Sequence, residues 1–153
     1  MTISIQREPI DPTLEYDRLV GESPGPAVAT FTGYVRDHAD DRQVCMLELE
    51  HYPEMASRVL KDLGCKATLQ FDLSNWRIVH RFGELKVEES IVWVGAMADH
   101  RGEAISACEF MLDTLKTDAP FWKREIGPAG KSWVSSRTVD LRRRARWLSQ
   151  ENL

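Results

Sequence analysis

The sequence predicts an α+β fold in a single domain, residues 1–153, built on a mixed or antiparallel sheet. Its 153 residues are 42% apolar, which suffices for one compact core at this length. The expected strands and helices do not follow strict strand–helix–strand alternation, which separates the chain from the α/β class. The Pro/Gly-rich run from Gly21 to Pro26 is too short for a domain linker and is interpreted as a loop.

The N-terminal segment predicts a strand and then a short helix. Alternating polarity over Ile3 to Arg7 is typical of a strand. Asp11 and Pro12 form a helix start, because aspartate caps free backbone N–H groups and proline is tolerated at the first helical position. This helix is expected to reach Val20 and to end at Gly21.

The next segment predicts two strands and a second helix. β-branched and aromatic residues indicate strands over Ala27 to Val35 and Val44 to Glu50. We interpret the polar segment between them, Arg36 to Gln43, as a mobile connection and a candidate lid. Pro53 is expected to start the helix, and Gly64, which costs about 1 kcal/mol inside a helix, is expected to end or weaken it.

The central segment predicts a pair of strands and the clearest helix. The strands are Trp76 to Phe82 and Ser90 to Ala98, joined by a charged turn from Gly83 to Glu89. A helix is expected from Gly102 to Thr117, because its apolar residues recur at spacings of three and four and Pro120 forbids continuation. These apolar residues are Ala104, Ile105, Cys108, Met111, Leu112 and Leu115.

The C-terminal segment predicts two short strands and a basic tail. The strands, Phe121 to Ile126 and Ser132 to Ser135, flank a turn rich in glycine and proline. The tail, residues 137–153, is basic at its start. One possible helical face in it carries Leu141, Ala145 and Leu148.

Charge and composition exclude several classes of function. A net charge of -4 argues against general binding to nucleic acid or to anionic membranes, both of which need a basic face. The N-terminus has no long apolar run, so we expect neither a signal peptide nor a membrane span.

Cys45, Cys65 and Cys108 form no C-x-x-C pair, which favours the reducing cytoplasm. None of them resembles an activated sulfur carrier. The four histidines lack ligand spacing, so no metal or cofactor is expected.

Cations stand where several of the expected strands and helices end. If these side chains converge, repulsion and partial desolvation would lower a lysine pKa, supply a neutral amine and hold a phosphate. Two alternatives remain open: Lys116 could merely complement the helix dipole, and Asp99 could cap the helix while His100 and Arg101 face solvent. The cations are Arg36, His100, Arg101, Lys116, Lys123 and Arg124.

Four stretches resemble the molybdopterin synthase catalytic (large) subunit family. They are residues 30–36 (TFTGYVR), 49–53 (LEHYP), 80–85 (HRFGEL) and 115–125 (LKTDAPFWKRE), joined by the pair His100-Arg101 before the long helix. The similarity runs from about Ala27 to Arg137, and the lysine-to-glutamate stretch is its most specific part.

The resemblance implies a cytoplasmic sulfurtransferase of molybdenum cofactor biosynthesis. Such an enzyme converts cyclic pyranopterin monophosphate into molybdopterin by adding the two sulfurs of the dithiolene. The donor is the thiocarboxylated C-terminal Gly-Gly of a small ubiquitin-like partner subunit. This chain ends in Gln150 to Leu153, so donation in trans is expected. The family also implies an α/β-hammerhead element and a homodimer of catalytic subunits within a heterotetramer.

The resemblance also assigns roles to individual residues. Lys116 matches the essential lysine, which attacks the thiocarboxylate or assists as a base, and Lys123 matches a second important lysine. Tyr34 stands where the family often has lysine, a departure that removes one cation from the pocket edge. Phe121 and Trp122 are either core aromatics or a stacking surface for the pterin. The matched anion-binding and pocket residues are Val35, Arg36, His100, Arg101, Arg124, Glu125 and, contributed by the neighbouring subunit, Arg137.

Two other classes of function compete with this one. The same cations could grip a partner's C-terminal tail without chemistry, which would make the chain a binding module. Alternatively the chain could be an oligomeric scaffold whose Arg142-Arg143-Arg144 run contacts other proteins, although such a run is usually a solvated helix face.

Overall fold

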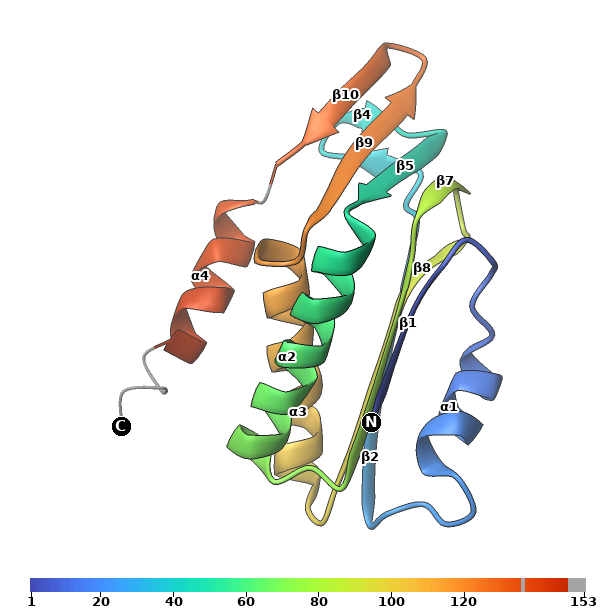
Figure 1. Cartoon of the computed structure of the whole chain (residues 1–153). Coiled ribbons are helices and arrows are strands. Elements are labelled where there is room, and N and C mark those ends of the chain that lie inside the picture. The colour runs from blue at the N-terminus through green and yellow to red at the C-terminus, as the bar shows by residue number, and fades with distance from the viewer. Residues whose placement is uncertain (136, 149–153) are drawn as a thin grey trace.

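Two four-stranded sheets and a small hairpin carry the fold in the part of the chain that the computed structural model describes, residues 1–135 and 137–148 (Figure 1). In the first sheet β1 and β6 are parallel and the other neighbours are antiparallel. Its strands, in spatial order, are β1 (Thr2–Gln6), β6 (Asn75–Arg81), β8 (Ser90–Ala98) and β2 (Ala27–Tyr34).

The second sheet is antiparallel and stands at one end of the first (Figure 1). The short pair β3 (His38–Ala39) and β4 (Arg42–Gln43) forms a separate hairpin. The α+β prediction is therefore confirmed. The strands of the second sheet, in spatial order, are β10 (Gly130–Val134), β9 (Phe121–Gly127), β5 (Met46–His51) and β7 (Gly83–Lys86).

Helices cover both faces of the first sheet. Helix α1 (Pro12–Val20) packs on one face, α2 (Pro53–Phe71) and α3 (Arg101–Thr117) pack on the other, and α4 (Thr138–Leu148) lies against α3 (Figure 1). Alternate residues of a strand therefore enter different cores: Ile78 and Val94 contribute to the α2–α3 side, whereas Val79 and Trp93 contribute to the α1 side. No described helix is long and apolar enough to cross a membrane.

The helix starts follow the local chemistry of the sequence. The Asp11 carboxylate accepts hydrogen bonds from the backbone N–H groups of Thr13 (2.9 Å) and Leu14 (3.3 Å), as the capping prediction requires. Pro53 stands at the start of α2, where a missing N–H costs nothing.

Gly64 does not end α2, contrary to expectation, and the helix continues to Phe71. A Cβ atom built at Gly64 would overlap the indole ring of Trp76, which is 3% exposed. The glycine is present because the helix approaches the sheet closely at this tryptophan. Burial of the ring outweighs the helix propensity that glycine forfeits.

Four further expectations need correction. The segment Arg36 to Gln43 is not irregular throughout, because it contains the β3–β4 hairpin. The expected turn Gly83 to Glu89 contains β7, which pairs with β5. In α4 the buried residue is Trp147, whereas the face predicted to be apolar is exposed. Ile105, placed in the apolar stripe of α3, is also exposed, at 58%.

Candidate active site

Three chain segments meet where α3 ends. Helix α3 ends, and β9 and α4 begin, where the helices meet the second sheet (Figure 1). Lys116 lies in the last turn of α3, and Lys123 lies on β9 after the turn at Pro120. Pro120 stops the helix, and this short connection brings both lysines to one end of the α3 cylinder.

The surroundings of Lys123 shift the pKa of its amine. Burial lowers its pKa from the usual lysine value, and the positive charges of Arg137, Lys116 and Arg36 lower it further. The carboxylate of Glu125 acts in the opposite direction. The cations that act on Lys123 come from the last turn of α3 and from the segments that follow β2 and β10. Of the six cations in the convergence hypothesis, Lys116 and Arg36 thus act on Lys123, and they do so together with Arg137.

Lys116 is about half exposed at the edge of this cluster. Its Nζ lies 3.7 Å from Oδ1 of Asp140 in the first turn of α4. The preceding residue, Leu115, is buried at 8% exposure. Lys116 therefore lies next to the buried face of α3, with its own side chain about half exposed.

Acidic groups flank the cluster. The Glu125 carboxylate is on the same face of β9 as Lys123, is 8% exposed, and lies 3.4 Å from Nη2 of Arg42. Nη1 of Arg42 also donates to the Ser132 hydroxyl at 3.0 Å. Asp40, on the same hairpin as Arg42, lies 3.6 Å from Arg137. The β3–β4 hairpin therefore contacts the site through both ends of its turn.

Arg124 lies on the opposite face of β9 from Lys123. Its Nε and Nη2 donate to Oε2 of Glu48 at 3.1 and 2.6 Å, and its guanidinium is 5.0 Å from the centre of the Trp133 ring. The structure thus pairs Arg124 with a carboxylate and does not bring it to the lysines.

Tyr34 and Val35 differ in exposure. Tyr34 is 52% exposed at the end of β2, whereas the Val35 side chain is buried with Leu47, Leu49 and Leu85. Any contact of Val35 with a ligand would therefore use its backbone.

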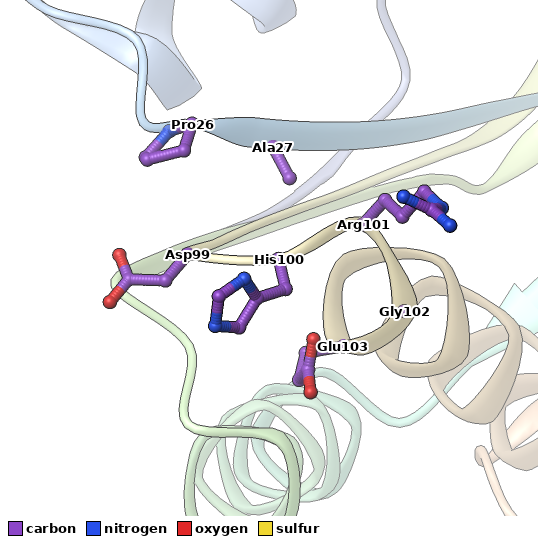
Figure 2. Close-up of a pocket in the computed structure, with 7 residues that line it drawn as sticks. All are labelled: Pro26, Ala27, Asp99, His100, Arg101, Gly102 and Glu103. Carbon is purple, nitrogen blue, oxygen red and sulfur yellow. The ribbon is translucent and has the colours of Figure 1, made fainter.

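His100 and Arg101 lie at the other end of α3. With 17 residues this helix is about 25 Å long, so one chain does not place them beside Lys116. They line an open hollow of about 520 Å³, in which Asp99 and Arg101 point in different directions on either side of His100 (Figure 2). The N-cap is His100, without a side-chain cap bond, so the alternative that Asp99 caps the helix is wrong.

The two neighbouring aromatic residues have different environments. Phe121 packs against the main core, and its ring stacks on His80 at 3.9 Å between ring centres. Trp122 is 43% exposed and meets the Tyr52 ring edge-on at 4.8 Å. Phe121 is thus a core aromatic, and Trp122 lies on the Arg124 face, away from Lys123.

Sequence reasoning missed Asp40, Arg42 and Asp140. Each contacts a predicted site residue, but Arg42 and Glu125 are 83 residues apart, and no motif or spacing links such pairs. The polar character of the hairpin was the only signal, and it pointed to a lid rather than to particular side chains.

The fold and the site define a class: a small α+β protein with lysines and arginines gathered near the end of one helix. The chain belongs to the MoaE protein family, whose model matches residues 5–118. The resemblance inferred from the motifs is thereby confirmed.

Relatives extend the match over nearly the whole chain. A molybdopterin synthase catalytic subunit from Ralstonia nicotianae is 43% identical over 147 residues, 95% of this chain and 84% of that protein. Two solved structures share the fold. The molybdopterin biosynthesis MoaE protein from Burkholderia ambifaria has a TM-score of 0.80 at 41% identity, covering 95% of this chain and 97% of that one. A molybdopterin synthase from Staphylococcus aureus has a TM-score of 0.79 at 31% identity, covering 86% and 96%.

Proposed function

We propose that this chain is the catalytic subunit of a molybdopterin synthase. It moves sulfur from the thiocarboxylated C-terminus of a small ubiquitin-like partner to cyclic pyranopterin monophosphate, forming the dithiolene of molybdopterin. Each partner molecule gives up one sulfur, and water supplies the oxygen with which its C-terminus returns to a carboxylate. The clustering of Lys116, Lys123, Arg36 and Arg137 at the end of α3 is the observation that carries the proposal.

The cluster suits both anions of this reaction. A phosphate and a thiocarboxylate each gain from several cations in a partly dehydrated site. Because burial and neighbouring charges lower the pKa of Lys123, a larger fraction of this amine is neutral at a given pH than for an exposed lysine. We assign Lys116 as the amine that attacks the thiocarboxylate or assists as a base, with Lys123 beside it.

We further propose that His100 and Arg101 serve a site completed by a second copy of the chain. A separation of about 24 Å along α3 exceeds the reach of a single pterin phosphate. A homodimer within a heterotetramer, with Arg137 crossing between copies, would resolve this separation. Within a single chain Arg137 acts on the pKa of Lys123. That Arg137 also reaches the site of the second copy is therefore a separate part of the proposal. The expectation of donation in trans rested on Gln150 to Leu153. These residues lie outside the described part of the chain.

The test is a single-turnover assay with thiocarboxylated partner and pyranopterin substrate. Replacing Lys116 with alanine should lower the rate of dithiolene formation by about 10²-fold or more, because a positioned amine is lost. Lys131→Ala, an exposed lysine on β10, is the matched control and should leave the rate unchanged. A wild-type rate in K116A together with weakened partner binding would make the chain a binding module.

The scaffold alternative is best tested by point changes rather than truncation. Trp147 and its partners fasten α4 to the core, so removing the tail would expose apolar surface. Arg142 and Arg143 are exposed, whereas Arg144 pairs with Asp118 at 2.8 Å. If Arg142→Glu with Arg143→Glu leaves the mass measured by light scattering unchanged, the arginine run does not drive assembly.

A further inference from the structure

Helix α4 is fixed on α3 by a ladder of polar contacts. Asp113 of α3, which is 4% exposed, accepts hydrogen bonds from Nε1 of Trp147 and Nη2 of Arg146, both at 2.9 Å. Glu109 lies 2.6 Å from the Arg146 guanidinium. A buried carboxylate with two donors fixes the rotation of α4 as well as its distance from α3.

This rotation determines what the first turn of α4 presents to the site. Asp140 precedes Arg144 by four residues and Trp147 by seven, so all three share the face of α4 toward α3. The Asp140 side chain is only 17% exposed. Arg137 accepts the first α4 backbone bonds, from the N–H groups of Asp140 (3.0 Å) and Leu141 (3.1 Å). Docking of α4 therefore places Arg137 and Asp140 together.

One contact in the ladder has the opposite polarity from the others. At Asp113, Glu109 and Asp118 the acid belongs to α3 or its end, and the arginine belongs to α4. At Lys116 and Asp140 the cation belongs to α3 and the acid to α4. This reversal occurs at Lys116, the lysine that is central to the proposed function. It gives Lys116 an acidic neighbour, Asp140, in a region where the positive charges of Lys123 and Arg137 would repel it.

We propose that Asp140 is a positioning residue for Lys116. Its carboxylate holds the Lys116 amine at the mouth of the cation cluster, against repulsion from Lys123 and Arg137, until an anionic ligand engages the cluster. The inference rests on the proposed function for its catalytic consequence, but the contact can be tested independently. An amine held in place reacts faster with a ligand bound in the same site than one that samples many rotamers, because misplacement by about 1 Å can cost up to about 100-fold in rate. Towards a reagent that arrives from solution, the held amine is instead the less accessible one.

The first test measures catalysis in Asp140→Asn, Asp140→Glu and Glu109→Gln. E109Q is the matched control, because it also removes one acidic partner between α3 and α4 but lies seven residues before Lys116. We expect D140N to lower the single-turnover rate by about tenfold at saturating substrate, with little change in KM. We expect D140E to recover part of that loss and E109Q to match wild type.

The second test measures the amine without any turnover. Limited labelling by an acetylating reagent, read by mass spectrometry, should modify Lys116 severalfold faster in D140N than in wild type. The same comparison for E109Q should show no change. Thermal unfolding of each variant reports whether α4 remains docked.

The outcomes separate the two proposals. Wild-type turnover and labelling in D140N would overturn the positioning role, and so would equal losses in D140N and E109Q accompanied by lowered melting temperatures. If the wild-type protein transfers no sulfur but the labelling contrast persists, the proposed function fails while the positioning role stands.

Discussion

At the scale of single residues, burial determines which ionisable groups are poised. Lys123 lies two residues after Phe121, and the His80 ring stacks on the Phe121 ring. Both Lys123 and His80 have pKa values below their usual range, because burial disfavours the charged form. For Lys123 the neighbouring cations add to this effect. For His80 the Arg81 carbonyl, 2.8 Å from Nδ1, opposes it. The lowered pKa suits Lys123 to act as a neutral amine in a reaction. The lowered pKa of His80 keeps its ring uncharged in the core.

We expect His80 to make the fold sensitive to acid. Burial lowers its pKa from 6.5 to about 4, so the folded state binds a proton less readily than the unfolded chain. Its contribution is fully present above pH 6.5 and is lost as the pH falls toward 4, which amounts to about 3 kcal/mol. Urea unfolding at several pH values measures this loss.

His80→Gln provides the comparison, because glutamine does not titrate in this range. It should lower stability at pH 7 yet give a flatter decline between pH 6.5 and 4. Equal slopes in the two proteins would show that other groups, such as the paired carboxylates, cause the acid sensitivity.

The sequence predicted the lysines of the candidate site but not the residues that contact them. Lys116 and Lys123 could be selected because each lies next to a helix end or a proline turn, which are local signals. Asp140 is 24 residues beyond Lys116, and its proximity depends on how α4 docks. Arg124 shows the reverse case: it carries the right charge next to Lys123, but strand alternation turns it to the other face.

At the scale of elements, close packing explains where local propensity failed. Gly64 weakens a helix in isolation, yet α2 passes through it because the Trp76 ring occupies the space of a side chain. Capping and proline signals did predict the starts of α1 and α2, because these effects act within a few residues. The strand β7 was missed because its partner, β5, is distant in sequence. The strands β3 and β4 pair with each other locally, but two residues are too few to show the alternation that predicts a strand.

Gly64→Ala should therefore destabilise the protein, although alanine is the better helix former. Forcing a methyl group against Trp76 should cost about 2 kcal/mol or more, which exceeds a propensity gain of about 1 kcal/mol. Gly102→Ala in α3 is the matched control, because a Cβ there meets nothing within 4 Å. Urea denaturation checks both, and a stabilised G64A would contradict the packing explanation.

At the scale of the whole molecule, the two sheets have different roles. The first sheet and its helices build the core, while the second sheet, the hairpin and α4 surround the end of α3 with charged groups. Composition and element order sufficed to predict the class of fold. They did not predict that β5, β7, β9 and β10 leave the first sheet, because that choice depends on pairing across up to 80 residues.

The separation of Arg101 from Lys116 leads to a prediction about assembly. If a second copy completes each site, K116A and R101A subunits mixed during refolding should recover activity that neither variant has alone. In a twofold dimer the mixed species has one intact site, so random mixing should restore about a quarter of wild-type activity. Absence of recovery, with mixed dimers verified by mass spectrometry, would argue against a composite site.

The five tryptophans fall into two environments. Trp76, Trp93 and Trp147 are at most 6% exposed, whereas Trp122 and Trp133 are 43% and 58% exposed on the Arg124 face of the second sheet. The intrinsic fluorescence of the protein consequently combines a blue-shifted interior emission with a red-shifted surface emission. A quencher dissolved in the buffer reaches the second emission alone, which makes this sheet face a natural optical probe for any molecule that covers it.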